Sequence, residues 1–599
     1  MNQPDPRAPG AAAAGAGLWG IDLGTTNSVI AQLKDGRAVP IAIDGDPIVP
    51  SVVLFQEDGS VVVGRPARNL ELLHPERAVR SAKRKMGTDH QFVVADGAAG
   101  APRRVSPEAV SAEILRALKL GAQASTGVAV DDVVITVPAY FDDAQRRATL
   151  KAGELAGLNV LRLLNEPTSA ALVYEQAGLD AGGSQTLLVY DLGGGTFDVS
   201  VLDVFEGIRE VKATSGNTHL GGDDFDELLV RRFADHLRLK GADVAADPRA
   251  MARLRRLAEE TKIKLSRDTE VVVREEFIGR AAGAPVHLEL RVDRSELEEL
   301  LLPLLATTVE LSLQAVKEAG LAPKDIQTIC LVGGSTRIPL VRSLLAEAFA
   351  ADVHEEIDPD LAVGLGAAVQ AGLLKGVAVE RILVDVAAHT LGIRTVGVFD
   401  EDLDEEPDTF SPVLRRNTAL PAERAEVFAT LVDDQPRIEF TVFQGEAPRC
   451  SENTRVGSFT FPLLPAPAGA PVRCSFAYDL NGIIRVHVLQ IGTDNEKTVA
   501  MTVADKSARA PDLDRDDEEE EEEEENEDDI DDVPAVSSAP AGAVERRARK
   551  LLERGAFARR DALVKLLDRY LAATGSAKAD AEDALLDLFV ELEADAEDG

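Results

Sequence analysis

Two glycine-rich turns, each opened by an aspartate, constrain the fold of this chain more than any other feature. The first turn lies in Gly20–Ser28 and the second in Asp191–Asp198, and apolar runs precede and follow both. This pattern predicts two β-hairpins, because glycine tips allow backbone N–H groups to close around a phosphate. A third turn, Val332–Pro339, ends another apolar strand. The three turns together predict a nucleotide held between two similar lobes, whereas the single-loop Walker pattern is absent.

Composition narrows the class of protein. The 599 residues are too many for one core, and 45% hydrophobic residues are enough for several. Aromatic residues make up 4% and the net charge is −39, so neither base stacking nor phosphate-backbone binding is favoured. No apolar run approaches the roughly eighteen residues of a membrane span. We therefore expect neither nucleic acid nor a membrane as a partner.

The number and spacing of the cysteines indicate whether the protein works in a reducing or an oxidising compartment. Cys330, Cys450 and Cys474 are widely spaced and form no C-x-x-C pair or Cys/His cluster. Neither a disulfide framework nor a zinc site is therefore expected. The first residues are rich in Pro, Ala and Gly and lack the apolar core of a signal peptide. A reducing compartment fits best, and we predict a cytoplasmic location.

Changes in sequence character divide the chain into six segments. In chain order we predict a disordered tail (1–17), an α/β nucleotide-binding domain (18–376), an interdomain linker (377–387), an antiparallel β domain (388–508), an acidic disordered linker (509–541) and a short helical region (542–599). The strand–turn–strand element occurs twice in the α/β domain, which predicts a duplicated half. Residues 512–532 carry seventeen acids and one arginine, so they are expected to be a solvated, extended spacer.

Local patterns predict elements within these segments. Expected strands cover 133–138, 428–432, 437–443, 455–461, 474–478, 483–489 and 498–503, and expected helices cover 143–155, 252–265 and 294–318. The helix over 143–155 is expected to turn its basic residues outward. Asn481-Gly482 is a strong signal for a tight hairpin between two of the strands.

The turns also carry groups suited to phosphate chemistry. The hydroxyls of Thr25, Thr26 and Thr196 can add to the backbone donors of the two turns. The carboxylates of Asp22, Asp191 and Asp198 can hold a Mg²⁺ shell, through water because Mg²⁺ gives up its waters reluctantly. One such turn alone is usually only a hairpin. The combination of two turns with the Gly-Gly-Ser turn is what favours a nucleotide site.

Further motifs show a resemblance to a known family. Val137–Phe141, Asn165–Ala171, His219–Asp226 and Gly366–Gln370, taken with the three turns, resemble the DnaK-type chaperones of the heat shock protein 70 family. The resemblance covers roughly residues 18–503. Within the family, the chain looks most similar to the shorter, specialised bacterial members of the HscC type.

The resemblance implies a fold and an activity. It implies an actin-like (duplicated ribonuclease H-like) α/β ATPase domain, then an antiparallel β-sandwich peptide-binding domain, then a short α-helical C-terminal region. The implied protein is a stress-response chaperone that binds exposed hydrophobic segments of unfolded proteins. Its Mg²⁺-dependent hydrolysis of ATP to ADP and phosphate would switch the β domain between low and high peptide affinity.

The resemblance also assigns residues. Catalytic roles fall to Lys83, Glu166, Asp191 and Thr196. Candidate nucleotide contacts are Gly24, Thr25, Thr26, Asn27, Gly193, Gly194, Gly195, Gly221, Gly222, Glu259, Lys262, Ser266, Gly333, Gly334, Ser335, Arg337 and Asp360. Interdomain coupling falls to Pro138, Arg146, Ile382, Leu383, Val384 and Asp385. Peptide contacts fall to Ile393, Thr395, Val396, Phe428, Ile438 and Phe440.

Cofactors and partners follow from the same resemblance. ATP and Mg²⁺ are the implied cofactors, with K⁺ as a candidate further ion. The implied partners are unfolded or client polypeptides and a J-domain co-chaperone, with a nucleotide exchange factor as a further candidate.

The sequence departs from the family pattern in and after the linker. Arg381 stands where an aliphatic residue is usual, and Ala387–Gly392 replaces the usual Thr-Pro-Leu-Ser-Leu-Gly. An acidic insert, Asp400–Asp408, interrupts the first hairpin of the β domain, and the C-terminal helices are shorter than the family's lid. These departures leave the ATPase and the peptide site in place but bring lid closure and interdomain signalling into question.

Two other functions stay open at this point. A small-molecule kinase of the same two-lobed superfold would have a sugar pocket in the cleft and no peptide-binding β domain. A regulator that binds one client and uses nucleotide only as a structural ligand would fit the altered linker.

Overall fold

The computed structural model describes residues 17–95, 102–174, 185–205, 208–349, 351–354, 357–377, 382–395, 408–501 and 560–572. The predicted tail up to residue 16, the acidic linker and Val396 lie outside the described residues. Of the predicted C-terminal helical region, the structure describes one helix, α11 (Arg560–Ala572).

The α/β part contains two six-stranded sheets with the same core topology. The first has the order β11-β10-β1-β2-β3, with β4 paired to β2, and the second has the order β18-β17-β12-β13-β14-β19. In each sheet a hairpin strand pairs in parallel with a later strand of the chain, as β1 does with β10 and β12 with β17. This repeated order agrees with the predicted recurrence of the strand–turn–strand element.

The strands of the first sheet are β1 (Trp19–Asp22), β2 (Asn27–Lys34), β3 (Arg37–Pro40), β4 (Val49–Pro50), β10 (Asp132–Val137) and β11 (Asn159–Asn165). Those of the second are β12 (Gln185–Leu192), β13 (Phe197–Phe205), β14 (Ile208–Asn217), β17 (Thr328–Val332), β18 (Asp352–His354) and β19 (Ile382–Val384).

Two buried helices join the sheets. α9 (Ala362–Leu374) packs on β1 and β2 of the first sheet, and α4 (Glu166–Tyr174) packs on β12 and β13 of the second. The two helices contact each other closely, because Gly366 has no side chain. A Cβ there would lie 1.8 Å from the carbonyl oxygen of Ser169. This close crossing holds the two hairpins on opposite sides of one cleft.

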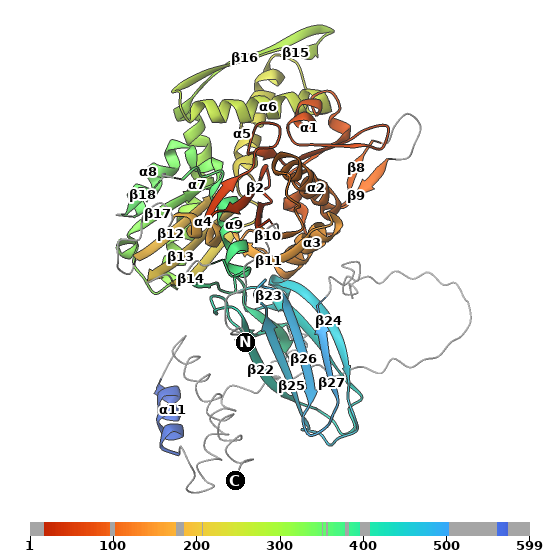
Figure 1. Cartoon of the computed structure of the whole chain (residues 1–599), viewed down its shortest axis with the longest axis vertical. Helices are drawn as coiled ribbons and strands as arrows, with labels where there is room; N and C mark the ends of the chain where they lie inside the picture. Colours follow the sequence, from red (N-terminus) through yellow and green to blue (C-terminus); the bar gives the residue numbers. More distant parts are fainter. Residues whose placement is uncertain are drawn as a thin grey trace, which may run out of the picture.

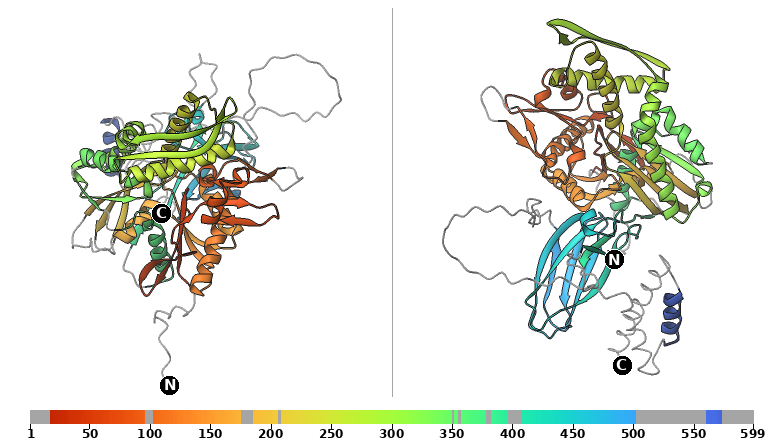
Figure 2. Two further views of the ribbon diagram at one scale, coloured as in Figure 1. Left: turned by 90° about the horizontal axis from the view of Figure 1, so that it is seen from above. Right: turned by 180° about the vertical axis from the view of Figure 1, so that it is seen from behind.

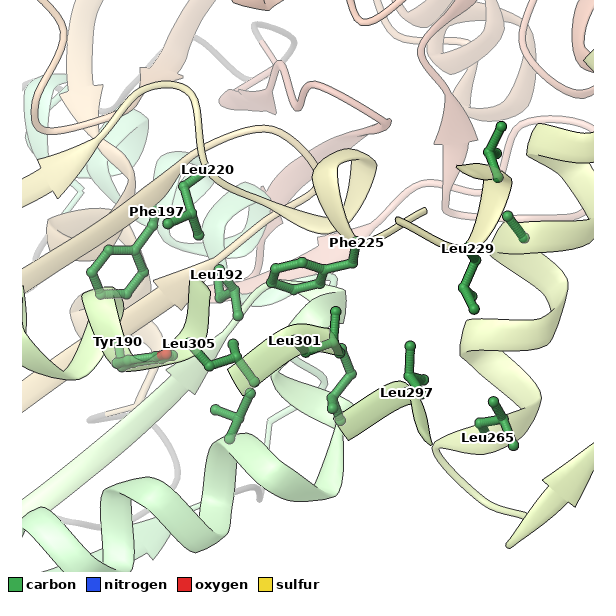
Figure 3. Packing of buried hydrophobic residues seen from close by; sticks show 14 of the residues in the cluster. Tyr190, Leu192, Phe197, Leu220, Phe225, Leu229, Leu265, Leu297, Leu301 and Leu305 are labelled. Carbon is green, nitrogen blue, oxygen red and sulfur yellow. The ribbon is translucent and has the colours of Figure 1, made fainter. Parts of the chain in front are cut away.

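Amphipathic helices cover the outer faces. They are α1 (Arg65–Leu70), α2 (Pro107–Thr126), α3 (Asp143–Leu155), α5 (Gly222–Leu239), α6 (Pro248–Leu265), α7 (Arg294–Glu318) and α8 (Pro339–Ala348). The largest hydrophobic cluster lies beneath α5 to α8, where Phe225 gathers with Leu192 and Leu301 (Figure 3).

α7 is the most apolar of the long helices and belongs to the core. It is long and apolar enough, by length and composition, to cross a membrane, and no other helix among the described residues meets that test. Leu297, Leu301 and Leu305 of this helix are nevertheless buried in the largest core cluster. Packing of a core helix accounts for their apolar character.

Smaller elements complete the α/β part. They are β5 (Val52–Phe55), β6 (Val61–Val63), β7 (Ala78–Arg80), β8 (Phe92–Val94), β9 (Arg103–Val105), and the long hairpin of β15 (Glu270–Ala281) and β16 (Ala284–Asp293). Figure 1 shows that hairpin at the end of the molecule farthest from strands β22 to β27.

The β part is a pair of four-stranded antiparallel sheets, ordered β21-β20-β23-β24 and β22-β25-β26-β27. Their strands are β20 (Leu391–Thr395), β21 (Thr409–Leu414), β22 (Ala422–Ala429), β23 (Arg437–Gln444), β24 (Thr454–Pro462), β25 (Pro471–Tyr478), β26 (Ile484–Gln490) and β27 (Glu496–Ala500). One hydrophobic cluster joins both sheets. The predicted strand over 428–432 is wrong in its bounds, since β22 ends at Ala429. The sequence patterns did not predict β20 or β21.

The β part lies against the α/β part, where Arg147 of α3 donates to the Ile484 carbonyl of β26 (Figures 1 and 2). The predicted linker becomes an edge strand, because Ile382, Leu383 and Val384 pair in parallel with Ile208–Glu210 of β14. This pairing orders the connection between the two parts.

Candidate functional site

A cleft of about 870 Å³ opens between the two sheets. Most of the predicted nucleotide, catalytic and metal residues line it. They are Asp22, Gly24, Thr25, Thr26, Asn27, Lys83, Glu166, Asp191, Gly193, Gly194, Thr196, Gly222, Glu259, Lys262, Ser266, Gly333, Gly334, Ser335, Arg337 and Asp360. Gly195, Gly221 and Asp198 are not among its lining residues. Asp198 is nonetheless buried beside the lining carboxylates.

The two glycine turns face each other across this cleft. A Cβ at Gly194 would lie 1.8 Å from Thr26 Oγ1, and one at Gly195 would lie 2.5 Å from Thr25 Cγ2. Glycine is therefore required sterically at the contact between the hairpins. The amide of Gly222 donates to the Gly193 carbonyl at 3.0 Å, which fixes the start of α5 beside the second turn.

The third turn completes the cleft wall. Gly333 has a φ of 81°, the left-handed region that favours glycine, and packs against the Leu192 carbonyl. The Ser335 hydroxyl donates to the Gly193 carbonyl at 3.0 Å. Arg337 donates to Asp360 at 3.0 Å. The second and third turns thus form one connected surface.

α6 supplies the last group of predicted contacts. Lys262 donates to the Gly222 carbonyl at 2.9 Å and pairs with Asp226 at 2.9 Å. Glu259 accepts from Arg68 of α1 at 2.6 Å, so an ion pair joins α6 to α1. Ser266 caps the carboxyl end of α6 rather than lying inside the helix.

A cluster of carboxylates lies at the floor of the cleft around one lysine. Lys83 pairs with Glu166 at 2.5 Å, and both side chains are buried. Burial, followed by repulsion from the Glu166 carboxylate, raises the pKa of Asp22 to about 7 and that of Asp198 to about 7. The same causes raise the pKa of Asp191 well above its ordinary value. The site holds more negative charge than Lys83 neutralises, and this excess favours a cation.

Comparison with known proteins decides the family. The family model described as "Hsp70 protein" matches residues 18–578. The chain is 44% identical over 494 residues to the chaperone protein DnaK of Thermotoga neapolitana, covering 81% of this chain and 80% of that relative. It is 42% identical over 493 residues to the chaperone protein DnaK of Thermosipho melanesiensis, with the same coverage of both proteins.

This chain belongs to the Hsp70 family. Members of that family are ATPases with chaperone activity, so the protein is an ATP-dependent chaperone that binds unfolded proteins. The resemblance seen in the sequence is confirmed at the level of the family. The similarity to the HscC type stays a prediction.

The predicted coupling residues of this Hsp70 protein meet the β part. Arg146 is buried and donates to Ala139 and Phe141 carbonyls, to Asn165 Oδ1, and to the Asn481 carbonyl of the β part at 3.2 Å. The expectation that the helix 143–155 turns all its basic residues outward is therefore wrong. Four oxygen acceptors surround Arg146, which compensates for the burial of its guanidinium.

Asp385 at the end of the linker is the second centre of contact. It is buried and accepts from Asn165 Nδ2 at 2.8 Å. Burial raises the pKa of Asp385, and the charges of Arg162 and Arg146 oppose that shift. Pro138 lies between β10 and the turn that carries these groups, where its carbonyl accepts from the Phe141 amide.

Further hydrogen bonds cross between the two parts. Asp143 Oδ1 accepts from the Ile484 amide at 2.9 Å, and Arg147 donates to the Ile484 carbonyl at 2.8 Å. Asn481 Oδ1 accepts from the Leu163 amide at 3.0 Å. These bonds place the predicted Asn-Gly hairpin directly on α3 and β11.

The predicted peptide contacts lie in the core of the β part. Ile393, Phe428, Ile438 and Phe440 are buried in one hydrophobic cluster. Phe440 stacks on Phe459 with ring centres 5.3 Å apart, and meets Phe428 edge-on at 5.9 Å. Thr395 is the last residue of β20. In this arrangement the apolar side chains of the predicted groove pack on one another.

Sequence reasoning missed several residues that line the cleft. They are Ile48, Asp223, Asp226, Ile263, Arg267, Val332, Thr336, Ile338, Asp358, Pro359 and Val363. Asp223 and Asp226 stand in the His219–Asp226 motif and Arg267 follows Ser266, so those motifs gave a signal. Nothing in the local sequence marks Ile48.

Proposed function

We propose that Mg²⁺·ATP binds between the two glycine turns, with its phosphates on their backbone amides. Lys83 would neutralise charge on the transferred phosphate, Glu166 and Asp191 would orient the attacking water, and Thr196 would contact the γ-phosphate. This assignment rests on the close contact of Gly194 with Thr26, which brings donors from both halves to one point.

The carboxylate cluster fits a metal held through water. Among the described residues, no group of three or more potential ligands is arranged for direct coordination. Asp22, Asp191 and Asp198 are instead buried carboxylates in excess of the available positive charge. Mg²⁺ usually keeps several waters, so these groups would accept hydrogen bonds from its hydration shell. Bound Mg²⁺ would supply electrostatic stabilisation of the phosphates.

We further propose an actin-like ATPase domain joined by the linker to a peptide-binding β-sandwich. ATP would favour the docked arrangement, with the linker paired to β14. Hydrolysis would release the β part and let it hold peptide tightly. Reversing such an equilibrium from 1:99 to 99:1 takes about 5.5 kcal/mol of differential binding. A J-domain co-chaperone would trigger hydrolysis, and the buried free cysteines fit a cytoplasmic location.

The proposed function is tested by the rate of ATP hydrolysis. We expect Mg²⁺-dependent release of phosphate that rises when an unfolded polypeptide is added, and rises further with a J-domain protein. A small-molecule kinase would transfer phosphate to sugar, and a purely structural nucleotide would not turn over. An unstimulated ATPase under all these conditions would contradict the proposal.

A prediction on stability follows from Asp198. Its pKa is raised to about 7 in the folded protein, so between about pH 4 and pH 7 the folded state holds a proton that the unfolded chain has released. The stability contribution of Asp198 therefore falls as the pH rises through this range. Replacing Asp198→Asn should stabilise the nucleotide-free protein at pH 8 by roughly 1–3 kcal/mol.

The measurement is thermal unfolding without nucleotide at pH 5 and pH 8. The gain in stability from Asp198→Asn should be large at pH 8. It should be small at pH 5, because Asp198 of the folded wild-type protein is already protonated at that pH. The exposed Asp89→Asn serves as the control and should change neither value. An Asp198→Asn protein that is equally destabilised at both pH values would refute the electrostatic account.

A further inference from the structure

We propose that His389 is a positioning residue that ties docking of the β part to the Asp198 carboxylate through the backbone of Tyr140. The ring makes that docking dependent on pH. The inference rests on the proposed docking cycle. It concerns the sequence departure at Ala387–Gly392, where a histidine enters the interface.

The geometry is a chain of two hydrogen bonds through one residue. The Tyr140 amide donates to Asp198 Oδ1 at 3.0 Å. The Tyr140 carbonyl oxygen lies 2.9 Å from His389 Nε2. The two rings also meet edge to face, with centres 4.3 Å apart and planes at 61°. Tyr140 thus has one polar backbone group engaged with the carboxylate cluster and the other with the β part.

The direction of the second bond is fixed by chemistry. A carbonyl oxygen only accepts, so His389 must donate through Nε2–H. The carbonyl of His389 in turn lies 3.4 Å from the Tyr478 hydroxyl, which donates to it. His389 is therefore held at two points, its ring by Tyr140 of the α/β part and its backbone carbonyl by Tyr478 at the end of β25.

Two acids and one cation act on the His389 ring, so their effects on its charged form cancel only in part. Asp142 and Glu446 face it as acids, and Arg146 faces it as a cation. Glu446 is already engaged, because both of its oxygens accept from Thr390. Partial burial at the interface lowers the pKa of His389, although the hydrogen bond to the Tyr140 carbonyl and the two acids oppose that shift. The docked interface therefore favours the neutral imidazole.

Undocking exposes the ring to water, where its pKa returns to about 6.5. Docking then requires loss of a proton at any pH below that value. Because one proton is linked to the equilibrium, the docking constant should fall by up to about fivefold over the first pH unit below 6.5, and the slope should approach but not exceed tenfold per unit at lower pH. Above pH 7 the constant should be insensitive to this residue's titration.

The test uses the full chain with saturating Mg²⁺·ATP. The readout is hydrogen exchange of the Ile382–Val384 amides, expressed at each pH relative to the unstructured exchange rate. His389→Gln keeps an N–H donor for Tyr140 but has no proton to lose. His487→Gln, three residues into β26 and beside Glu496 of β27, is the matched control. We expect protection to fall by up to about fivefold from pH 6.5 to 5.5 in wild type and in the control, but to stay constant in His389→Gln.

A second readout addresses Asp198. Coupling between docking and nucleotide binding is reciprocal, so the affinity for Mg²⁺·ATP should lose part of its pH dependence in His389→Gln. The same pH dependence of linker protection in His389→Gln and wild type would overturn the inference. Absence of ATP-dependent protection in wild type at pH 7.5 would instead overturn the docking cycle on which it rests.

Discussion

Replacing Lys83→Ala should lower the rate of ATP hydrolysis by about 100- to 1,000-fold while nucleotide still binds. The Lys83 side chain is buried at the cleft floor and is the cation paired with Glu166. Charge on the transferred phosphate grows in the transition state, so removing this preorganised cation costs more there than in the ground state.

The measurement is single-turnover hydrolysis together with nucleotide affinity. Lys85→Ala, an exposed lysine in the same 3₁₀ helix, is the control and should hydrolyse ATP at the wild-type rate. A Lys83→Ala protein with unchanged single-turnover rate would remove Lys83 from the catalytic role. Equal losses in both variants would point to a general disturbance of the helix.

Replacing Asp385→Ala should weaken ATP-dependent docking by about 100-fold, which corresponds to about 2.7 kcal/mol. In the docked arrangement the buried carboxylate lies beside two buried cations, Arg146 and Arg162. Without it those charges lose their counter-ion, and Asn165 loses its acceptor. The penalty applies to the docked state, so the variant should favour the released state.

Docking is read from protection of the linker amides in Mg²⁺·ATP. Asp385→Asn should lie between wild type and alanine, because it keeps a hydrogen-bond acceptor for Asn165 but no charge. Asp494→Ala, exposed beyond β26, is the control and should dock normally. Wild-type protection in Asp385→Ala would show that the buried charge does not hold the interface.

The hairpins could be predicted because their conformation is set locally. Aspartate, glycine and threonine at the tips between apolar strands specify a tight turn, whatever the rest of the chain does. The bounds of the helices over 143–155 and 294–318 were predicted correctly, since apolar spacing and capping residues define them. The contact between the turns was also to be expected, since both turns were predicted to hold one nucleotide.

Other features depend on tertiary contacts that leave little local signal. β22 has one buried residue, Phe428, among charged neighbours. The alternation of apolar and polar residues therefore predicted a strand only at the carboxyl end of β22. Arg146 is buried because acceptors from several distant segments surround it, and a helical pattern alone places arginine outside. His389 contacts Tyr140, 249 positions away, and nothing near it in the sequence indicates that contact.

The central claim is that ATP in the cleft controls the β part through the docked linker. Its most direct test is the affinity of the full chain for an extended apolar peptide, measured in saturating ATP and in saturating ADP. The account predicts affinity at least about tenfold weaker in ATP, with faster release of peptide. Equal affinities and equal release rates in the two nucleotides would contradict it.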